Sequence, residues 1–476
     1  MKWRFSRRQT KSSLWAKSAN ERPESRVVLE THAFLKLAIP LAIAQVAQFA
    51  VSFVDTIMMG HLSTASLAAG GLASATFQMA LTVVTGFVMS VGVLAAEAYG
   101  ADKKHRLTGL ARQGLWLCLL MALPFMLLLS QMTAVLTVLQ QPETVVKLAQ
   151  HYYSGVALGV LPALGFAMLR GYLSAFSLAT VVTGVVAIGT AFNIACNYVL
   201  GFGKFGFPRL ELLGLGIGSA LSLWLMFLLF LLYIVRHPEL SQYQFWRNWQ
   251  YPNSKILRQL AVVGAPISLT LILELGMFTT LAFMAGSLGT EVLAAHQIAF
   301  QMIALIFMVP IGMSQAVTTR VGLWFGRGDI LGARRAGLVA AGAVAVFLGI
   351  SAIALFIFRP LLIGLFIDPK DAGSAEVIAI AMNLLLIASV AQVPDGVQRV
   401  VMSALYGLQD TKVPVILSAI AFWGIGISSG YILCFLAGWG AVGLWIGQYM
   451  GAAVAGISFI GRFYRLTNRM QTAKNR

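Results

Sequence analysis

The chain contains PLAIAQVAQFAVSFVDTIMMGHLSTASLAA at residues 40–69 and, 226 residues further on, PISLTLILELGMFTTLAFMAGSLGTEVLAA at residues 266–295. This register aligns Pro40 with Pro266 and Gly60 with Gly286, and it continues without a gap through the Leu-Ala-Ala run that ends each copy. Both copies are long apolar runs of the kind that cross a membrane. The repeat therefore predicts two structurally similar halves.

The same register extends well beyond these stretches. Small residues continue to coincide in the pairs Ala73 and Ala299, Gly86 and Gly312, and Gly100 and Gly326. At a slightly different offset, the run Arg170, Ser174, Ala175 lies over Arg399, Ser403, Ala404. The repeat thus spans most of each half.

The composition indicates a membrane protein. Of the 476 residues, 58% are hydrophobic and only 11% are charged, whereas soluble domains carry roughly a quarter charged residues. Apolar stretches recur from about residue 36 to about residue 461, each long enough to cross a hydrocarbon core of roughly 30 Å. We expect an all-α integral membrane protein of about twelve helices, near residues 36–59, 67–98, 108–138, 145–168, 175–200, 212–235, 257–284, 291–323, 333–364, 377–404, 413–436 and 440–462.

The expected helices divide evenly between the halves. Because each half has an even number of helices, the halves share one orientation and are related by an axis along the membrane normal. This predicts two six-helix lobes that enclose a central cavity and change its access by rocking. The expected segments are a basic N-terminal tail (1–32), an N-terminal lobe (33–236), an inter-lobe loop that acts as a hinge (237–256), a C-terminal lobe (257–462) and a basic C-terminal tail (463–476).

The net charge of +17 is explained by topology. With the N-terminus in the cytoplasm, that side receives both tails and the loops that hold Lys103, Lys104, Arg106, Arg247, Lys255, Arg327, Arg334, Arg335 and Lys412. The other side receives only Lys147, Lys204, Arg209, Arg359 and Lys370. Positive loops mark the cytoplasmic side, so we expect both termini in the cytoplasm. The charge does not indicate a nucleic-acid partner.

Three acids lie inside expected helices: Asp55, Glu274 and Asp395. An ionised side chain in hydrocarbon is costly, so such acids are candidates for function. A desolvated carboxylate binds a sodium ion or a proton and releases it when water enters, and this predicts that the three acids couple transport to a cation. Two alternatives stay open. Glu274 would be a protonated carboxyl hydrogen-bonded across a helix interface, and Asp395 would pair with Arg399 one turn away.

The two halves are not chemically equal. Under the 226-residue register Glu274 lies over Gln48, and Asp55 lies over Leu281. Each lobe therefore carries its own acid at its own depth.

Polar side chains on the expected helices are candidates for supporting the acids or binding substrate: Asn193, Asn197, Gln48, Gln297, Gln301, Gln392 and Gln398. Asn193 and Asn197 share a helix face and can bond either to Asp55 or to a neighbouring helix. The stripe of Gln392, Asp395, Gln398 and Arg399 is expected to face the cavity.

Several functions are excluded or disfavoured. The sequence has no G-x-x-x-x-G-K-[ST] loop, no H-E-x-x-H and no G-x-S-x-G, so ATP-driven pumping by this chain alone is excluded, and an enzyme is not expected. No cofactor is expected beyond the coupling ion, Na⁺ or H⁺. Cys118, Cys196 and Cys434 lie far apart in apolar segments and are interpreted as small core residues, as His296 is interpreted as a packing residue.

The run from Pro40 to Gly60 that ends in FVDTIMMG resembles the multidrug and toxic compound extrusion family. The second half is similar to the NorM-like branch of that family in Pro266, Glu274, the run 293–297, Pro310, the run 320–322 and the pattern of Asp395, Val397, Gln398, Tyr406 and Gly407. The resemblance covers about residues 33–462. It implies a V-shaped bundle that exports organic cations in exchange for sodium or protons. It also implies that Glu274 and Asp395 bind the cation in the C-terminal lobe, as Na⁺ ligands if sodium is used, and that Asp55 serves coupling in the N-terminal lobe.

We therefore expect a secondary antiporter that exports small, amphipathic, mostly cationic molecules. It is expected to lie in a bacterial-type plasma membrane, to contact lipids and to act as a monomer. Two alternatives stay open: a flippase for a lipid-linked precursor, which would need a cavity rich in basic residues, and a structural or sensory membrane protein whose acids only hold helices together. The residues do not choose between sodium and protons.

Overall fold

The computed structural model describes residues 23–241, 251–367 and 374–475. Within these ranges every regular element is a helix: α2 (Pro23–Leu62), α3 (Thr64–Gly100), α4 (Lys104–Val138), α5 (Glu143–Ala157), α6 (Val160–Ala175), α7 (Ala179–Phe202), α8 (Glu211–Arg236), α9 (Pro238–Ser241), α10 (Ser254–Gly286), α11 (Thr290–Gly326), α12 (Ile330–Gly364), α13 (Ser374–Gly407), α14 (Lys412–Ser418), η1 (Ala419–Ile427), α15 (Ser428–Tyr431), η2 (Ile432–Leu436) and α16 (Gly440–Asn475). In this part of the chain eleven helices are long and apolar enough to cross a membrane, and there are twelve if the bent pair α5 and α6 is counted as one span. The expected all-α membrane fold is confirmed.

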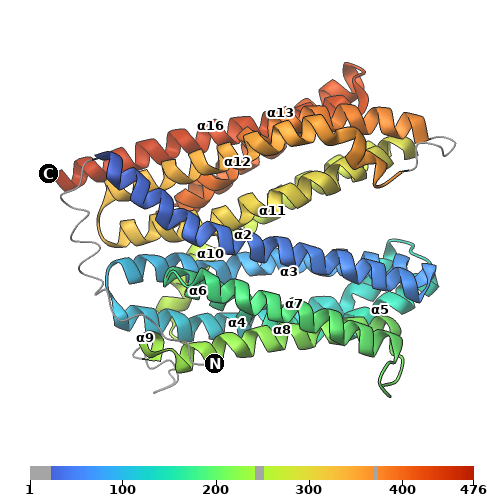
Figure 1. Cartoon of the computed structure of the whole chain (residues 1–476), viewed down its shortest axis with the longest axis horizontal. Coiled ribbons are helices and arrows are strands. Elements are labelled where there is room, and N and C mark those ends of the chain that lie inside the picture. Colours follow the sequence, from blue (N-terminus) through green and yellow to red (C-terminus); the bar gives the residue numbers. More distant parts are fainter. Residues whose placement is uncertain (1–22, 242–250, 368–373, 476) are drawn as a thin grey trace.

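The helices form two lobes (Figure 1). Helices α2 to α8 make the N-terminal lobe, and α10 to α16 make the C-terminal lobe. The lobes lie close together at the end of the bundle where α2 begins and α16 ends, which we call the tail end, and they separate toward the opposite end (Figure 1). The first helix of each lobe lies at the boundary, because α2 packs on α11 and α10 packs on α3.

The contacts between the lobes follow the sequence repeat. Gly86 of α3 lies against Ser268 of α10, and its equivalent Gly312 of α11 lies against Ala42 of α2, which is itself the equivalent of Ser268. Neither glycine could carry a Cβ atom without displacing the neighbouring backbone. Such reciprocal contacts are the mark of two-fold symmetry, here between the two halves of one chain.

The helices α3 and α11 cross near the tail end. Gly100 packs on the carbonyl of Leu323, and Gly326 packs on the carbonyl of Glu97, with no room for a Cβ atom at either glycine. Leu323 is the equivalent of Glu97, so this crossing is also reciprocal. The backbones meet this closely because glycine occupies both positions.

The expected helix near 145–168 is instead two helices. Residues 158 and 159 separate α5 from α6, and the pair is bent by 51°. Pro162 has no N–H to donate to the carbonyl of Leu158, and the indole Nε1 of Trp224 donates to that carbonyl at 3.0 Å. The proline explains why the span breaks here, and the tryptophan satisfies the carbonyl that the break leaves free.

Helices extend into both of the expected tails. The helix α2 starts at Pro23, before the expected boundary at residue 32, and α16 continues through the expected C-terminal tail to Asn475. Of the expected inter-lobe hinge, residues 237–241 and 251–256 are described, with α9 and the start of α10 among them, whereas residues 242–250 lie outside the described part.

Candidate functional site

A cavity of about 420 Å³ lies between the lobes. Helices α2, α3 and α6 line it from the N-terminal lobe, and α10, α11 and α13 line it from the C-terminal lobe. Its polar residues are amides, hydroxyls and two arginines, and none of the residues that line it carries a carboxyl group: Gln45, Gln48, Ser52, Gln78, Thr82, Thr85, Arg170, Ser174, Ser314, Gln315, Thr318, Thr319, Arg399, Ser403 and Tyr406. Phe49, Met89, Met308 and Met402 add apolar surface.

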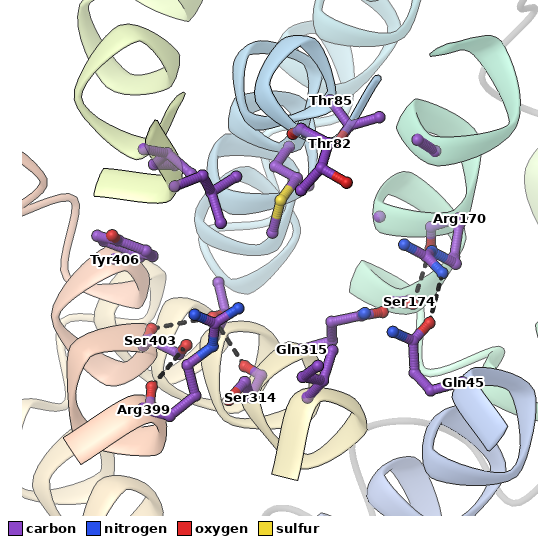
Figure 2. Close-up of a pocket in the computed structure, with 18 of the residues that line it drawn as sticks. Gln45, Thr82, Thr85, Arg170, Ser174, Ser314, Gln315, Arg399, Ser403 and Tyr406 are labelled. Carbon is purple, nitrogen blue, oxygen red and sulfur yellow. Dashed lines mark hydrogen bonds between the residues drawn. The ribbon is translucent and has the colours of Figure 1, made fainter. Parts of the chain in front are cut away.

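Arg170 and Arg399 lie on opposite sides of the cavity with Gln315 between them (Figure 2). In each case a serine one turn further on donates to the arginine's backbone carbonyl, Ser174 at 2.7 Å and Ser403 at 3.0 Å. These two Arg-Ser pairs are the ones that coincide in the sequence repeat. The repeat thus places an arginine on each of the two walls of one cavity.

One partner of each arginine is also equivalent in the repeat, yet these two partners differ in charge. Arg170 Nη1 donates to Gln45 Oε1 at 2.8 Å and to Gln48 Oε1 at 3.1 Å. Arg399 Nη1 forms an ion pair with Glu274 Oε2. Because Gln48 is the equivalent of Glu274, one geometry occurs in both lobes with an amide in one and a carboxylate in the other.

The acids of the C-terminal lobe lie together beside the cavity wall. Glu274 of α10 holds Arg399, and Asp395 of α13 lies close enough to both for their charges to act on it. The alternative pairing of Arg399 with Asp395 is wrong, because the carboxylate that pairs with Arg399 is Glu274. Among the described residues no group of three or more His, Cys, Asp or Glu side chains surrounds a possible metal position, so a Na⁺ ion at this pair of acids would also need neutral oxygen ligands.

The predicted stripe on α13 faces the cavity only at Arg399. Gln392 is 0% exposed and Gln398 is 3% exposed, and Arg399 is the residue of the stripe that lines the cavity. The reason is that α13 packs against α11, α12 and α16, with Gly456 of α16 directly over Gln398. Gln392 and Gln398 therefore lie inside the lobe, and the amide of Gln392 makes no hydrogen bond to any described residue.

One of the two predicted asparagines bonds directly to the acid of the N-terminal lobe. Asn197 Nδ2 donates to Asp55 Oδ1 at 2.8 Å and to Asn193 Oδ1 at 3.2 Å. Asn193 Nδ2 in turn donates to the hydroxyls of Ser222 at 3.2 Å and Ser219 at 3.3 Å. The predicted bond to Asp55 is present for Asn197, whereas Asn193 follows the other alternative and bonds to the neighbouring helix α8. The two serines were missed, although their spacing of three residues in an apolar helix is a signal that could have found them.

Two of the predicted site residues lie away from the cavity. Gln297 and Gln301 of α11 are exposed and do not line the cavity. His296 is buried and bonds to the indole Nε1 of Trp445 through Nδ1 at 3.0 Å, which confirms its interpretation as a packing residue. Cys118 and Cys434 are buried, Cys196 is half-buried, and all three are free.

The tail end holds contacts that the sequence did not predict. Both carboxylate oxygens of Glu30 accept from Arg320, at 2.8 Å from Nε and 2.6 Å from Nη2, and Oε2 also accepts from the indole of Trp324 at 2.9 Å. Gln409, after α13, donates to Glu97 of α3 at 3.3 Å. These contacts and the crossing of α3 with α11 join the lobes between the cavity and the tail end.

Comparison with known proteins gives consistent matches. The family model MatE matches residues 40–199 and 266–432, which start at the two prolines of the repeat. The Probable multidrug resistance protein NorM of Synechococcus sp. is 50% identical over 447 residues, which are 94% of this chain and 96% of that protein. The Multidrug resistance protein NorM of Burkholderia vietnamiensis is 36% identical over 92% of this chain and 94% of that protein.

Solved structures share the fold. The crystal structure of MATE in the bent conformation has a TM-score of 0.85 at 20% identity and covers 95% of this chain and 99% of that one. The Vibrio cholerae MATE transporter VcmN in the bent form has a TM-score of 0.83 at 18% identity, with 94% and 99% covered. The two-lobe architecture is therefore one that known transporters adopt.

Proposed function

Because this chain belongs to the multidrug and toxic compound extrusion (MATE) family, we propose that it exports small organic molecules as a secondary active antiporter that works by alternating access. It is a multi-pass membrane protein, and its relatives are named as multidrug resistance proteins, which are transporters and not enzymes. The observation that carries the proposal is a polar cavity between two symmetric lobes, with an acid site in each lobe next to it.

The coupling ion is Na⁺ or H⁺, and its candidate binders are Asp55 in one lobe and Glu274 with Asp395 in the other. Both sites lie outside the cavity lining, so an ion and a substrate need not compete for the same atoms. Binding of an ion to a site buried in one lobe can instead alter how that lobe packs on its partner, which is the coupling that antiport requires.

The proposed orientation in the membrane follows from the basic loops. With both termini in the cytoplasm, the contacts at the tail end close the cavity on the cytoplasmic side, and the conformation described here faces outward. The protein is proposed to work as a monomer in the plasma membrane of a bacterial-type cell.

The substrate is proposed to be amphipathic. Phenylalanine, methionine and glutamine side chains around the cavity tolerate varied shapes. The cationic preference expected from the family resemblance has less support, because the lining contains two arginines and no carboxyl group. The same two arginines are what a flippase for an anionic lipid-linked precursor would need, so this second candidate is kept as an outcome of the test.

The test is flux of a fluorescent organic cation in proteoliposomes under an imposed sodium gradient or an imposed pH gradient. We expect flux under one gradient in the wild type and its loss in Asp395→Asn and Asp55→Asn. Arg209→Gln, at an exposed arginine of the α7–α8 loop, is the control. If neither gradient drives flux of the organic cation, the exporter is rejected and the flippase is favoured. If flux is unchanged in both acid variants, the assignment of these acids as coupling residues is rejected.

A further inference from the structure

We propose that Arg170 forms an anion-binding subsite in the central cavity, so that the transported molecules include amphipathic compounds that carry a carboxylate. This inference rests on the proposed export function and specifies its substrate class. Its basis is the comparison of Arg170 with Arg399, which occupies the equivalent place in the other lobe.

The equivalent site shows what Arg170 lacks. Arg399 is neutralised by Glu274, a carboxylate supplied by the first helix of its own lobe. The first helix of the N-terminal lobe supplies Gln48 at that position, and its amide oxygen accepts the same hydrogen bond without a negative charge. The fold thus places a counter-ion beside one arginine and leaves the other with its full positive charge.

Among the described residues, none of the partners of the Arg170 guanidinium carries a negative charge. The partners of the Arg170 guanidinium are the amides of Gln45 and Gln48, both reached through Nη1, and the ring of Phe166 at 5.6 Å from Cζ. Within the described residues no carboxylate forms an ion pair with Arg170. Its Nε and Nη2 make no hydrogen bond to these residues, and the side chain lines the cavity.

A cation in such a place is costly unless an anion joins it. A guanidinium offers two parallel N–H groups that match the two oxygens of a carboxylate. The amide of Gln78 on α3 also lines the cavity, and Phe49 and Met89 provide apolar surface for the body of the molecule. The combination selects a carboxylate attached to an apolar or aromatic scaffold.

The test uses two dyes that differ in one group: a cationic xanthene dye with a free carboxylate, which makes it a zwitterion, and the methyl ester of the same dye. Equilibrium binding is measured by fluorescence polarisation on the purified full-length protein. A hydrogen-bonded charge pair of this kind is worth roughly tenfold to hundredfold in Kd. We expect Arg170→Gln to raise the Kd of the acid by about tenfold or more and that of the ester by less than about twofold, with Arg170→Lys between wild type and Arg170→Gln.

Arg209→Gln serves as the matched control, because it removes the same charge from an exposed loop outside the cavity. If Arg170→Gln does not fold, the proposal is tested on the wild-type protein alone. The dye with the free carboxylate must then raise the Tm of the wild type more than its methyl ester does. Equal stabilisation by the two dyes, or an equal loss of both dyes in Arg170→Gln, would overturn the subsite. Flux of the ester under an ion gradient tests the exporter separately, so the two failures are distinguishable.

Discussion

Glu30 of α2 and Arg320 of α11 form a bidentate ion pair that joins the two lobes at the tail end, with side chains only 3% and 5% exposed. The pair lies between lobes, so it holds only while the tail end is closed. The indole of Trp324 adds a third hydrogen bond to the same carboxylate. Opening the cavity toward the tails requires all three bonds to break.

Replacing Glu30 by alanine should therefore favour the conformation that is open at the tail end. Removing one partner of a buried ion pair costs about 3–5 kcal/mol, which is enough to shift a two-state equilibrium strongly. The measurement is labelling of Gln315→Cys by a membrane-impermeant maleimide applied from the tail side, with Cys118, Cys196 and Cys434 changed to alanine.

The control for this experiment is Glu143→Ala, since Glu143 pairs with Lys147 on the exposed surface of α5 and such a pair is worth about 0–1 kcal/mol. Faster labelling in Glu30→Ala with no change in Glu143→Ala is the expected result. Identical labelling rates in all three proteins would show that the ion pair does not hold the tail end closed.

Gly326→Ala should hinder closure by sterics alone. Its Cβ would collide with the carbonyl of Glu97, whereas Gly342 of α12 faces open space. We expect faster tail-side labelling of Gln315→Cys and slower transport for Gly326→Ala, and neither effect for Gly342→Ala. Normal transport by Gly326→Ala would mean that α3 and α11 do not need this close crossing.

Gln48→Glu should give the N-terminal lobe the same ion pair as the C-terminal lobe. The new carboxylate would neutralise Arg170, because Gln48 already accepts its hydrogen bond at 3.1 Å. Binding of the carboxylate dye should weaken by roughly tenfold or more, while binding of its methyl ester is kept or strengthened. Fluorescence polarisation with both dyes measures this, and stronger binding of the acid would contradict the expected neutralisation.

Asn197→Ala should impair the acid site of the N-terminal lobe. Asn197 donates the hydrogen bond to Asp55 and also bonds to Asn193, and loss of a hydrogen bond to a charged group costs about 1.5–3 kcal/mol. We expect a lower Tm and a changed ion concentration for half-maximal transport. Asn468→Ala, at an exposed position that pairs with Arg334, should change neither, and an unaltered ion dependence in Asn197→Ala would remove Asp55 from the coupling mechanism.

Much of the molecule could be predicted from the residues. The spans followed from apolar length, and the two lobes followed from the repeat, whose equivalent pairs reappear as reciprocal contacts such as Gly86 with Ser268 and Gly312 with Ala42. The link between Asp55 and Asn197 was also predictable, because an acid inside a membrane span needs a polar partner and few are available.

Other features needed the tertiary structure. Helical spacing showed that Gln392, Asp395, Gln398 and Arg399 share one face, but it could not show whether that face meets the cavity or α16. The position of Glu30 in a polar, basic stretch gave no sign that it would be buried against Arg320, 290 residues away along the chain.

The sequence by itself determined the class of the protein, its spans, its repeat and the identity of its intramembrane acids, because these depend on local hydrophobicity and spacing. Only the tertiary structure decided which charges meet. In the folded chain Glu274 forms an ion pair with Arg399, Gln48 accepts a hydrogen bond from Arg170, and Glu30 forms an ion pair with Arg320 that joins the lobes at the tail end. The physical reason is that the net charge of a buried site depends on which helices pack together, and that packing joins residues far apart in the chain.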